Sequence, residues 1–138
     1  MKKYLLDTNV VSEVRKPKPH GAVVAWLSHL RDEQVFLSAV TLGELQAGVE
    51  RTRHQNPAKA REIELWIDQI ETTFAVLPMD AACFREWGRT MHGRPEHRVE
   101  DGMIAATART HELIVATRNE DDFAQLAVAV LNPFKNHS

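Results

Sequence analysis

Short apolar runs alternate along the whole chain with segments of helical periodicity, and this alternation limits the possible folds more than any other feature. Each run is continuous and mostly aliphatic, which is typical of strands buried on both faces. The runs span residues 4–6, 35–37, 75–77, 113–116 and 127–131. Strands that alternate with helices favour a parallel sheet, because right-handed crossovers place helices on both of its faces. The sequence therefore predicts an α/β fold, a three-layer sandwich around a central parallel sheet of about five strands.

The segments between these runs repeat apolar residues at the spacing of one helix face. Such stripes occupy residues 23–30, 63–70 and 84–91. Trp66 and Trp87 lie in register with the stripes of their segments, so we interpret both as core residues. Asn56 and Pro57 interrupt a longer helical region, which predicts a helical hairpin over residues 41–74.

Length and composition indicate an ordinary globular protein. The chain has 138 residues, and a domain typically has roughly 100 to 200, so we expect a single domain over residues 1–138. With 43% hydrophobic residues, the chain can build a buried core. No apolar run approaches the roughly 18 residues of a membrane span, and Asp7 interrupts the apolar stretch that a signal peptide would need. These observations predict a cytoplasmic protein with no membrane association.

Acidic side chains follow several of the predicted strands. Asp7 comes directly after the first run, Glu44 follows the second, and Asp122 follows the fourth. The carboxyl ends of parallel strands share one edge of the sheet, where such folds keep their chemistry, so we expect these acids to lie together. Each also has an ordinary structural interpretation. Asp7 could cap a helix, Glu44 could form a capping box with Thr41, and Asp122 could favour a helix dipole.

Asp101 is harder to explain as a structural residue. It lies on a predicted helix whose residues at +3, +4 and +7 are Ile104, Ala105 and Ala108, so its carboxylate projects from an apolar face. Burying a carboxylate is costly unless a cation or hydrogen bonds compensate it. Several carboxylates in one crevice are tolerable if they bind a hard divalent cation, Mg²⁺ or Mn²⁺. The seven histidines and the single cysteine form no zinc motif.

Four short motifs, in this order, resemble those of PIN-domain nucleases, and in particular VapC-like toxins of bacterial type II toxin-antitoxin pairs. They are Tyr-Leu-Leu-Asp-Thr-Asn (4–9), Ser-x-x-Thr-x-x-Glu-Leu-x-x-Gly (38–48), Asp-x-Met-Ile-Ala-Ala-Thr-Ala (101–108) and Thr-x-Asn-x-x-Asp-Phe (117–123). Any one motif alone is unspecific, but the set covers nearly the whole chain. One departure is Gly102, where the family more often has alanine or a similar small residue.

The resemblance implies a metal-dependent endoribonuclease that uses Mg²⁺ or Mn²⁺. Its acidic site would consist of Asp7, Glu44, Asp101 and Asp122, with Asp7 and Asp101 as direct metal ligands and the other two completing a second metal position or orienting water. Polar residues that match the family's supporting positions are Asn9, Thr117 and Asn119. Whether Asp121 or Asp122 is the fourth acid stays open at this point, as does the number of metal ions.

The same resemblance implies two partners, an RNA substrate and a cognate antitoxin, in a homodimer or a toxin-antitoxin hetero-oligomer. We expect the antitoxin on the 41–74 hairpin, where Leu42, Leu45 and Val49 form a stripe that looks longer than a core of this size needs. A noncatalytic PIN-like RNA- or protein-binding module is the alternative, since such a module could keep the fold and use the acids only structurally.

Any RNA-binding surface must be local, because the net charge is only −2. Four arginines fall within fourteen residues that lead into the helix of Asp101. They are Arg85, Arg89, Arg94 and Arg98. A solvated helix face is the ordinary interpretation of this spacing, and a rim that binds phosphates is the functional one. A second basic group, residues 15–18, follows Asp7.

Overall fold

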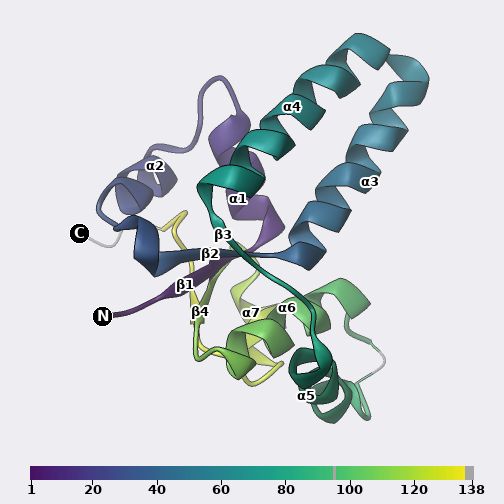
Figure 1. Ribbon diagram of the computed structural model, residues 1–138. Helices are drawn as coiled ribbons and strands as arrows, with labels where there is room; N and C mark the ends of the chain where they lie inside the picture. The colour runs from purple at the N-terminus through teal and green to yellow at the C-terminus, as the bar shows by residue number, and fades with distance from the viewer. Residues whose placement is uncertain (95, 136–138) are drawn as a thin grey trace.

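The computed structural model describes residues 1–94 and 96–135, and its elements alternate as the sequence predicts (Figure 1). The strands are β1 (Tyr4–Leu6), β2 (Val35–Ser38), β3 (Ala75–Leu77), β4 (Ile114–Ala116) and β5 (Val130–Leu131). The helices are α1 (Thr8–Arg15), α2 (Gly21–Ser28), α3 (Ala39–Gln55), α4 (Pro57–Thr73), α5 (Ala81–Met91), α6 (Val99–Thr110) and α7 (Glu120–Ala124), with a 3-10 turn over Asp32–Gln34. The strands form one parallel sheet in the order β3-β2-β1-β4-β5. The predicted α/β fold and five-stranded parallel sheet are confirmed.

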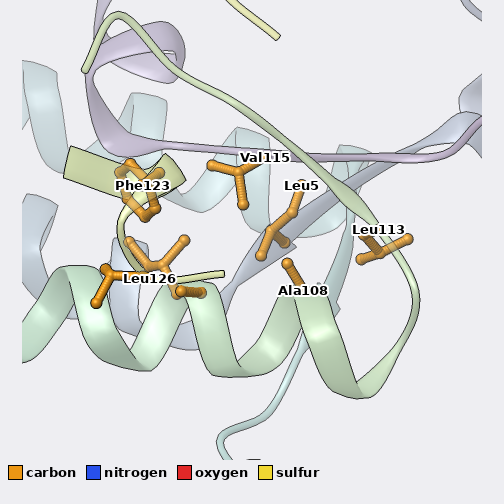
Figure 2. Packing of buried hydrophobic residues seen from close by; sticks show 8 residues of the cluster. Leu5, Ala108, Leu113, Val115, Phe123 and Leu126 are labelled. Carbon is orange, nitrogen blue, oxygen red and sulfur yellow. The ribbon is translucent and has the colours of Figure 1, made fainter. Parts of the chain in front are cut away.

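Helices cover both faces of the sheet, because successive side chains of each strand point to opposite faces. Leu6 packs with α1, α2 and α4 on one face, while Leu5 packs with α6 and α7 on the other. Figure 2 shows the second cluster, in which Val115, Phe123 and Leu126 surround Leu5. Both leucines are almost completely buried, so the first strand lies in the middle of the molecule.

The predicted helical hairpin is present as α3 and α4, which project together beyond the sheet (Figure 1). Asn56 ends α3 and caps α4, since its Oδ1 accepts a hydrogen bond from the Lys59 backbone N–H at 3.1 Å. The stripe of Leu42, Leu45 and Val49 packs against α4 and the core. Val49 is fully buried, whereas Leu42 and Leu45 are only partly buried, so α4 covers a part of the stripe.

Two element boundaries differ from the prediction. The last strand begins at residue 130 and not at 127, because Ala127 adopts a left-handed backbone conformation (φ 57°) and the chain turns there. The helix expected to begin near residue 41 begins at Ala39. In both cases the apolar residues were recognised, while a local turn or cap decided where the element starts.

Gly102 has a packing reason in this fold. A Cβ at this position would lie 2.5 Å from Met91 Sδ, so an alanine would require the methionine side chain to move. Glycine thus allows the end of α5 to approach α6 closely. No helix in the described part of the chain is long and apolar enough to cross a membrane.

The strand order creates a crevice at one edge of the sheet. From β1 the chain builds β2 and β3 to one side, and it then returns to build β4 and β5 on the other side. The connections that leave β1 and β4 therefore diverge at their carboxyl ends, which is where open parallel sheets bind ligands. Asp7 and Thr117 directly follow these two strands.

Candidate active site

Asp7 is the buried centre of this crevice, with 4% of its surface exposed. Its Oδ1 accepts a hydrogen bond from the Thr8 backbone N–H at 2.8 Å, so it also caps α1 as its ordinary interpretation predicts. Burial raises the pKa of Asp7 from 3.8 to about 6, against the lowering effect of its hydrogen bonds to Thr117 and Thr8. The charges of Asp101 and Glu44 raise this pKa further. The capping role therefore does not exclude a functional one.

Three polar residues predicted to support the site hold the loop after β4 against Asp7. Thr117 is fully buried, and its hydroxyl donates to Asp7 Oδ2 at 2.9 Å while it accepts from the Asn119 backbone N–H at 2.9 Å. Asn9 Oδ1 accepts from the backbone N–H of Arg118 at 3.3 Å. Asn119 occupies the N-cap position of α7, but its side chain makes no capping hydrogen bond.

Glu44 does not form the capping box with Thr41 that its spacing allowed. Ser38 caps α3 instead, with its Oγ accepting from the Val40 backbone N–H at 3.0 Å. That earlier start leaves Glu44 beyond the first turn, where its Oε1 accepts from the Thr8 hydroxyl at 2.8 Å. Its Oε2 accepts from Arg98 Nη2 at 3.0 Å. Glu44 is thus held toward the crevice by groups from α1 and from the start of α6.

Asp101 is the third residue of α6 and is 7% exposed, as its apolar neighbours predicted. Burial raises the pKa of Asp101, and the guanidinium of Arg98 opposes this effect. The charges of Glu44 and Asp122 also raise this pKa, so both lie close enough to act on Asp101. The adjacent Glu100 is 45% exposed at its side chain, so it is the more solvated of the two acids.

The two candidates for the fourth acid, Asp121 and Asp122, act on different groups. Both belong to the short helix α7 and both are exposed. Asp122 acts on the buried carboxyl of Asp101, whereas Asp121 acts on the ammonium of Lys135. The two acids therefore face different surroundings, and only Asp122 belongs with the other three.

The sequence analysis did not predict the contacts that the Thr8 side chain makes. Its hydroxyl joins α1 to α3 by hydrogen bonds to Glu44 Oε1 and to Thr41 Oγ1, the latter at 3.2 Å. Thr8 and Thr41 both lie inside the motifs quoted above, but the sequence does not reveal that they meet. The pairing becomes visible only when the sheet brings the ends of β1 and β2 together.

The donor set is suited to a hard cation, since every side chain at its centre offers oxygen. Among residues 1–94 and 96–135, no group of three or more histidine, cysteine, aspartate or glutamate side chains could hold a metal ion by itself. Mg²⁺ usually retains several waters and is bound by one or two carboxylates together with a substrate phosphate. The mutually repelling pair Asp7 and Asp101 fits that kind of site.

The four arginines proposed as an RNA rim have different partners. Arg89 pairs with Glu86 at 3.0 Å, and Arg94 donates to the carbonyl oxygen of Gln125. Arg98 alone faces the acids, and the charge of Asp101 raises the pKa of its guanidinium. Arg85 is exposed on α5 and has no ion pair within the described part of the chain.

Comparison with known proteins agrees with this geometry. The model of the PIN domain family matches residues 4–129, almost the whole chain. The chain belongs to the PIN domain family. This PIN domain is 43% identical over 139 residues to the Toxin FitB of Neisseria gonorrhoeae, covering 94% of the chain and 97% of the toxin. It is 34% identical over 142 residues to the VapC ribonuclease Y4jK of Sinorhizobium fredii, covering 95% and 97%.

Solved structures share the same PIN fold. The crystal structure of FitAcB from Neisseria gonorrhoeae superposes with a TM-score of 0.84 at 40% identity, covering 96% of this chain and 99% of that one. VapBC-5 from Mycobacterium tuberculosis, a member of the VapBC family of toxin-antitoxin systems, superposes with a TM-score of 0.65 at 28% identity, covering 95% and 97%. The family resemblance predicted from the four motifs is confirmed.

Proposed function

We propose that this PIN domain is a metal-dependent endoribonuclease and the toxin of a toxin-antitoxin pair. The observation that carries the proposal is the convergence of buried Asp7 and Asp101 with Glu44 and Asp122 at the point where the strand order reverses. Support also comes from relatives of nearly equal length that are known as a toxin and as a ribonuclease.

The ligands of the metal would be Asp7 and Asp101. Bound Mg²⁺ or Mn²⁺ would supply Lewis acidity, which activates a water and neutralises charge on the phosphate. Thr117 and the Thr8 backbone hold the Asp7 carboxylate by both oxygens, which fixes its direction before any ligand arrives. Burial raises the pKa of Asp7 to about 6, so the carboxylate is largely ionised at neutral pH and a bound cation would compensate its buried charge.

Glu44 and Asp122 would act beside this pair. Thr8 and Arg98 hold one oxygen each of Glu44, so its carboxylate is oriented but still part of a partly open crevice. Such a carboxylate can accept a proton from an attacking water or complete a second metal position. The exposed Asp122, whose charge also acts on Asp101, would serve the same two roles. Arg98 would balance the negative charge until a substrate phosphate is bound.

Cleavage of RNA by purified protein tests this proposal. We expect cleavage with Mg²⁺ or Mn²⁺ and none in EDTA, and loss of cleavage in Asp7→Asn and in Asp101→Asn. Asp121→Asn removes one exposed carboxylate from the same rim and should retain activity, which makes it the matched control. EDTA-resistant cleavage would contradict metal dependence. Binding of RNA without cleavage under all conditions would favour the noncatalytic module.

The proposed partners follow from the same relatives. We expect the enzyme to act on its RNA substrate in the cytoplasm, and a toxin of this kind requires a cognate antitoxin to restrain it. We expect the single domain of residues 1–138 to form a homodimer or a hetero-oligomer with that antitoxin. Co-expression of a tagged chain with the neighbouring gene should yield a stable complex with no RNA cleavage. A chain that is expressed freely and is harmless to its host would contradict this role.

A further inference from the structure

Two cavities meet at Glu44, one on each side of the helix that carries it. The first has a volume of about 310 Å³ and lies between α1, α3 and α4, where its lining includes Thr8, Arg15 and Trp66. The second has a volume of about 410 Å³ and lies between α3 and the start of α6, where its lining includes Arg98 and Met103. Glu44 and Arg51 line both cavities. The two spaces therefore adjoin along α3, with a proposed catalytic carboxylate between them.

The lining carries three guanidinium groups and two carboxylates. Arg98 is already paired with both acids, Glu44 and Glu100, so Arg15 and Arg51 are the cations left over. Arg15 and Arg51 are both exposed. Within residues 1–94 and 96–135, neither of them has a carboxylate at salt-bridge distance. A guanidinium without an acidic partner that lines a cavity is available to an anionic ligand, and its planar fork matches the oxygens of a phosphate.

The first cavity also has an apolar wall. Trp66 lines it together with Ile63, and the Arg15 guanidinium lies 5.9 Å from the centre of the Trp66 ring. Alternation of basic and aromatic side chains along a groove is how proteins bind single-stranded nucleic acid, because phosphates pair with the cations and bases stack on the rings or guanidinium planes. A cavity of about 310 Å³ falls in the lower range of small-ligand sites.

We propose that the two cavities form a groove for single-stranded RNA along α3, in which Arg15 and Arg51 bind backbone phosphates beside the scissile bond. The inference rests on the proposed function and adds which surface holds the substrate. It adds a groove built mainly from α1 and α3 to the rim expected over residues 85–98, of which Arg98 lines the second cavity. A cleaved strand must continue on both sides of its scissile phosphate, and the two cavities extend on either side of Glu44.

Binding of a short, fluorescein-labelled, single-stranded oligouridine tests this groove. Anisotropy is measured over a range of salt concentrations in the Asp101→Asn background, so that cleavage does not interfere. The double variant Arg15→Gln, Arg51→Gln should reduce the slope of log affinity against log salt by about 1.4, and the affinity by about tenfold at roughly 0.15 M salt. Lys2→Gln with Arg31→Gln removes the same charge before β1 and β2, at the other end of the sheet, and should change both quantities less.

Gly48 provides a test that leaves all charges in place. It lines the first cavity, and a Cβ there would meet only Arg51 Nη2, at an ordinary 3.6 Å. Gly48→Leu should fill the cavity and weaken RNA binding with little change in salt slope, while Gly48→Ala should bind like its parent. Both replacements favour the helix over glycine, so the melting temperature should not fall.

Three outcomes would overturn the inference. The first is that the double arginine variant binds RNA as well as its control does. The second is that Gly48→Leu and Gly48→Ala bind RNA equally well. Either result would leave the proposed nuclease function standing and assign the cavity to a protein partner. No RNA binding in the Asp101→Asn background itself would overturn the groove and the proposed function together.

Discussion

Replacing Asp7 with asparagine should stabilise the metal-free protein at neutral pH. The carboxylate is buried, and burial with the nearby charges of Asp101 and Glu44 raises its pKa from 3.8 to about 6. Asparagine has the same shape and carries no charge. Its Oδ1 can still accept from the Thr8 N–H, and its NH₂ group can donate to the hydroxyl oxygen of Thr117. The substitution therefore removes a charge, keeps the hydrogen bond from Thr8 and reverses the direction of the one with Thr117.

The magnitude follows from the shift of the pKa. A raised pKa means that Asp7 binds its proton more tightly in the folded state than in the unfolded state. The stability that Asp7 contributes is therefore complete below pH 3.8, and it is lost as the pH rises to about 6. A shift of roughly two units corresponds to about 3 kcal/mol in the free energy of unfolding. The difference between variant and parent should thus grow by about 3 kcal/mol between pH 3 and pH 7.

Urea denaturation of both proteins in EDTA, followed by circular dichroism across this pH range, measures that difference. Asp121→Asn serves as a control for the loss of one exposed acid from the same rim. Addition of Mg²⁺ should then stabilise the parent and leave Asp7→Asn nearly unchanged, because only the parent gains binding energy. A difference that stays constant with pH, or an asparagine variant that loses stability as the pH rises, would refute our account of Asp7.

Two further substitutions address the neighbours of the acids. Thr117→Val removes the hydroxyl that donates to Asp7 Oδ2 and stabilises the charged carboxylate, so the pKa of Asp7 should rise further. The acidic limb of the pH profile of cleavage should move to higher pH, and an unmoved limb would show that this bond does not control Asp7. Arg98→Gln removes the cation that faces Asp101 and Glu44, so Mn²⁺ should bind more tightly and raise the melting temperature more than in the parent. Weaker Mn²⁺ binding would instead make Arg98 part of the metal site.

The sequence predicted the fold because its signals were repeated along the chain. The apolar runs and helical stripes identified β1 to β4 and the hairpin, and the Asn56-Pro57 break between α3 and α4 is in the predicted place. The last strand was placed too early because nothing in the apolar run around Ala127 reveals a positive φ. The capping box failed because Ser38 competes with Thr41 for the start of α3, and only the backbone decides between them.

The acids could be located from sequence, while their partners could not. Asp7 and Asp101 stand out because one follows a buried strand and the other interrupts an apolar helix face. The contact of Thr8 with Glu44 joins residues 36 positions apart, and that of Arg98 with Glu44 joins residues 54 apart. Such pairs depend on how the strands are ordered in the sheet. For the same reason the sequence grouped Arg94 with Arg98, although only Arg98 faces the acids.

The central claim is that Asp7 and Asp101 form one metal site at the carboxyl ends of β1 and β4. Anomalous diffraction from crystals of the protein grown with Mn²⁺ tests it most directly. We predict a manganese peak in contact with one carboxylate oxygen from each of these residues, at about 2.1 Å, with the remaining ligands supplied by water. A peak beside Asp121 and Lys135 with none in the crevice, or a crevice in which the two carboxylates bind only protein groups, would contradict the account.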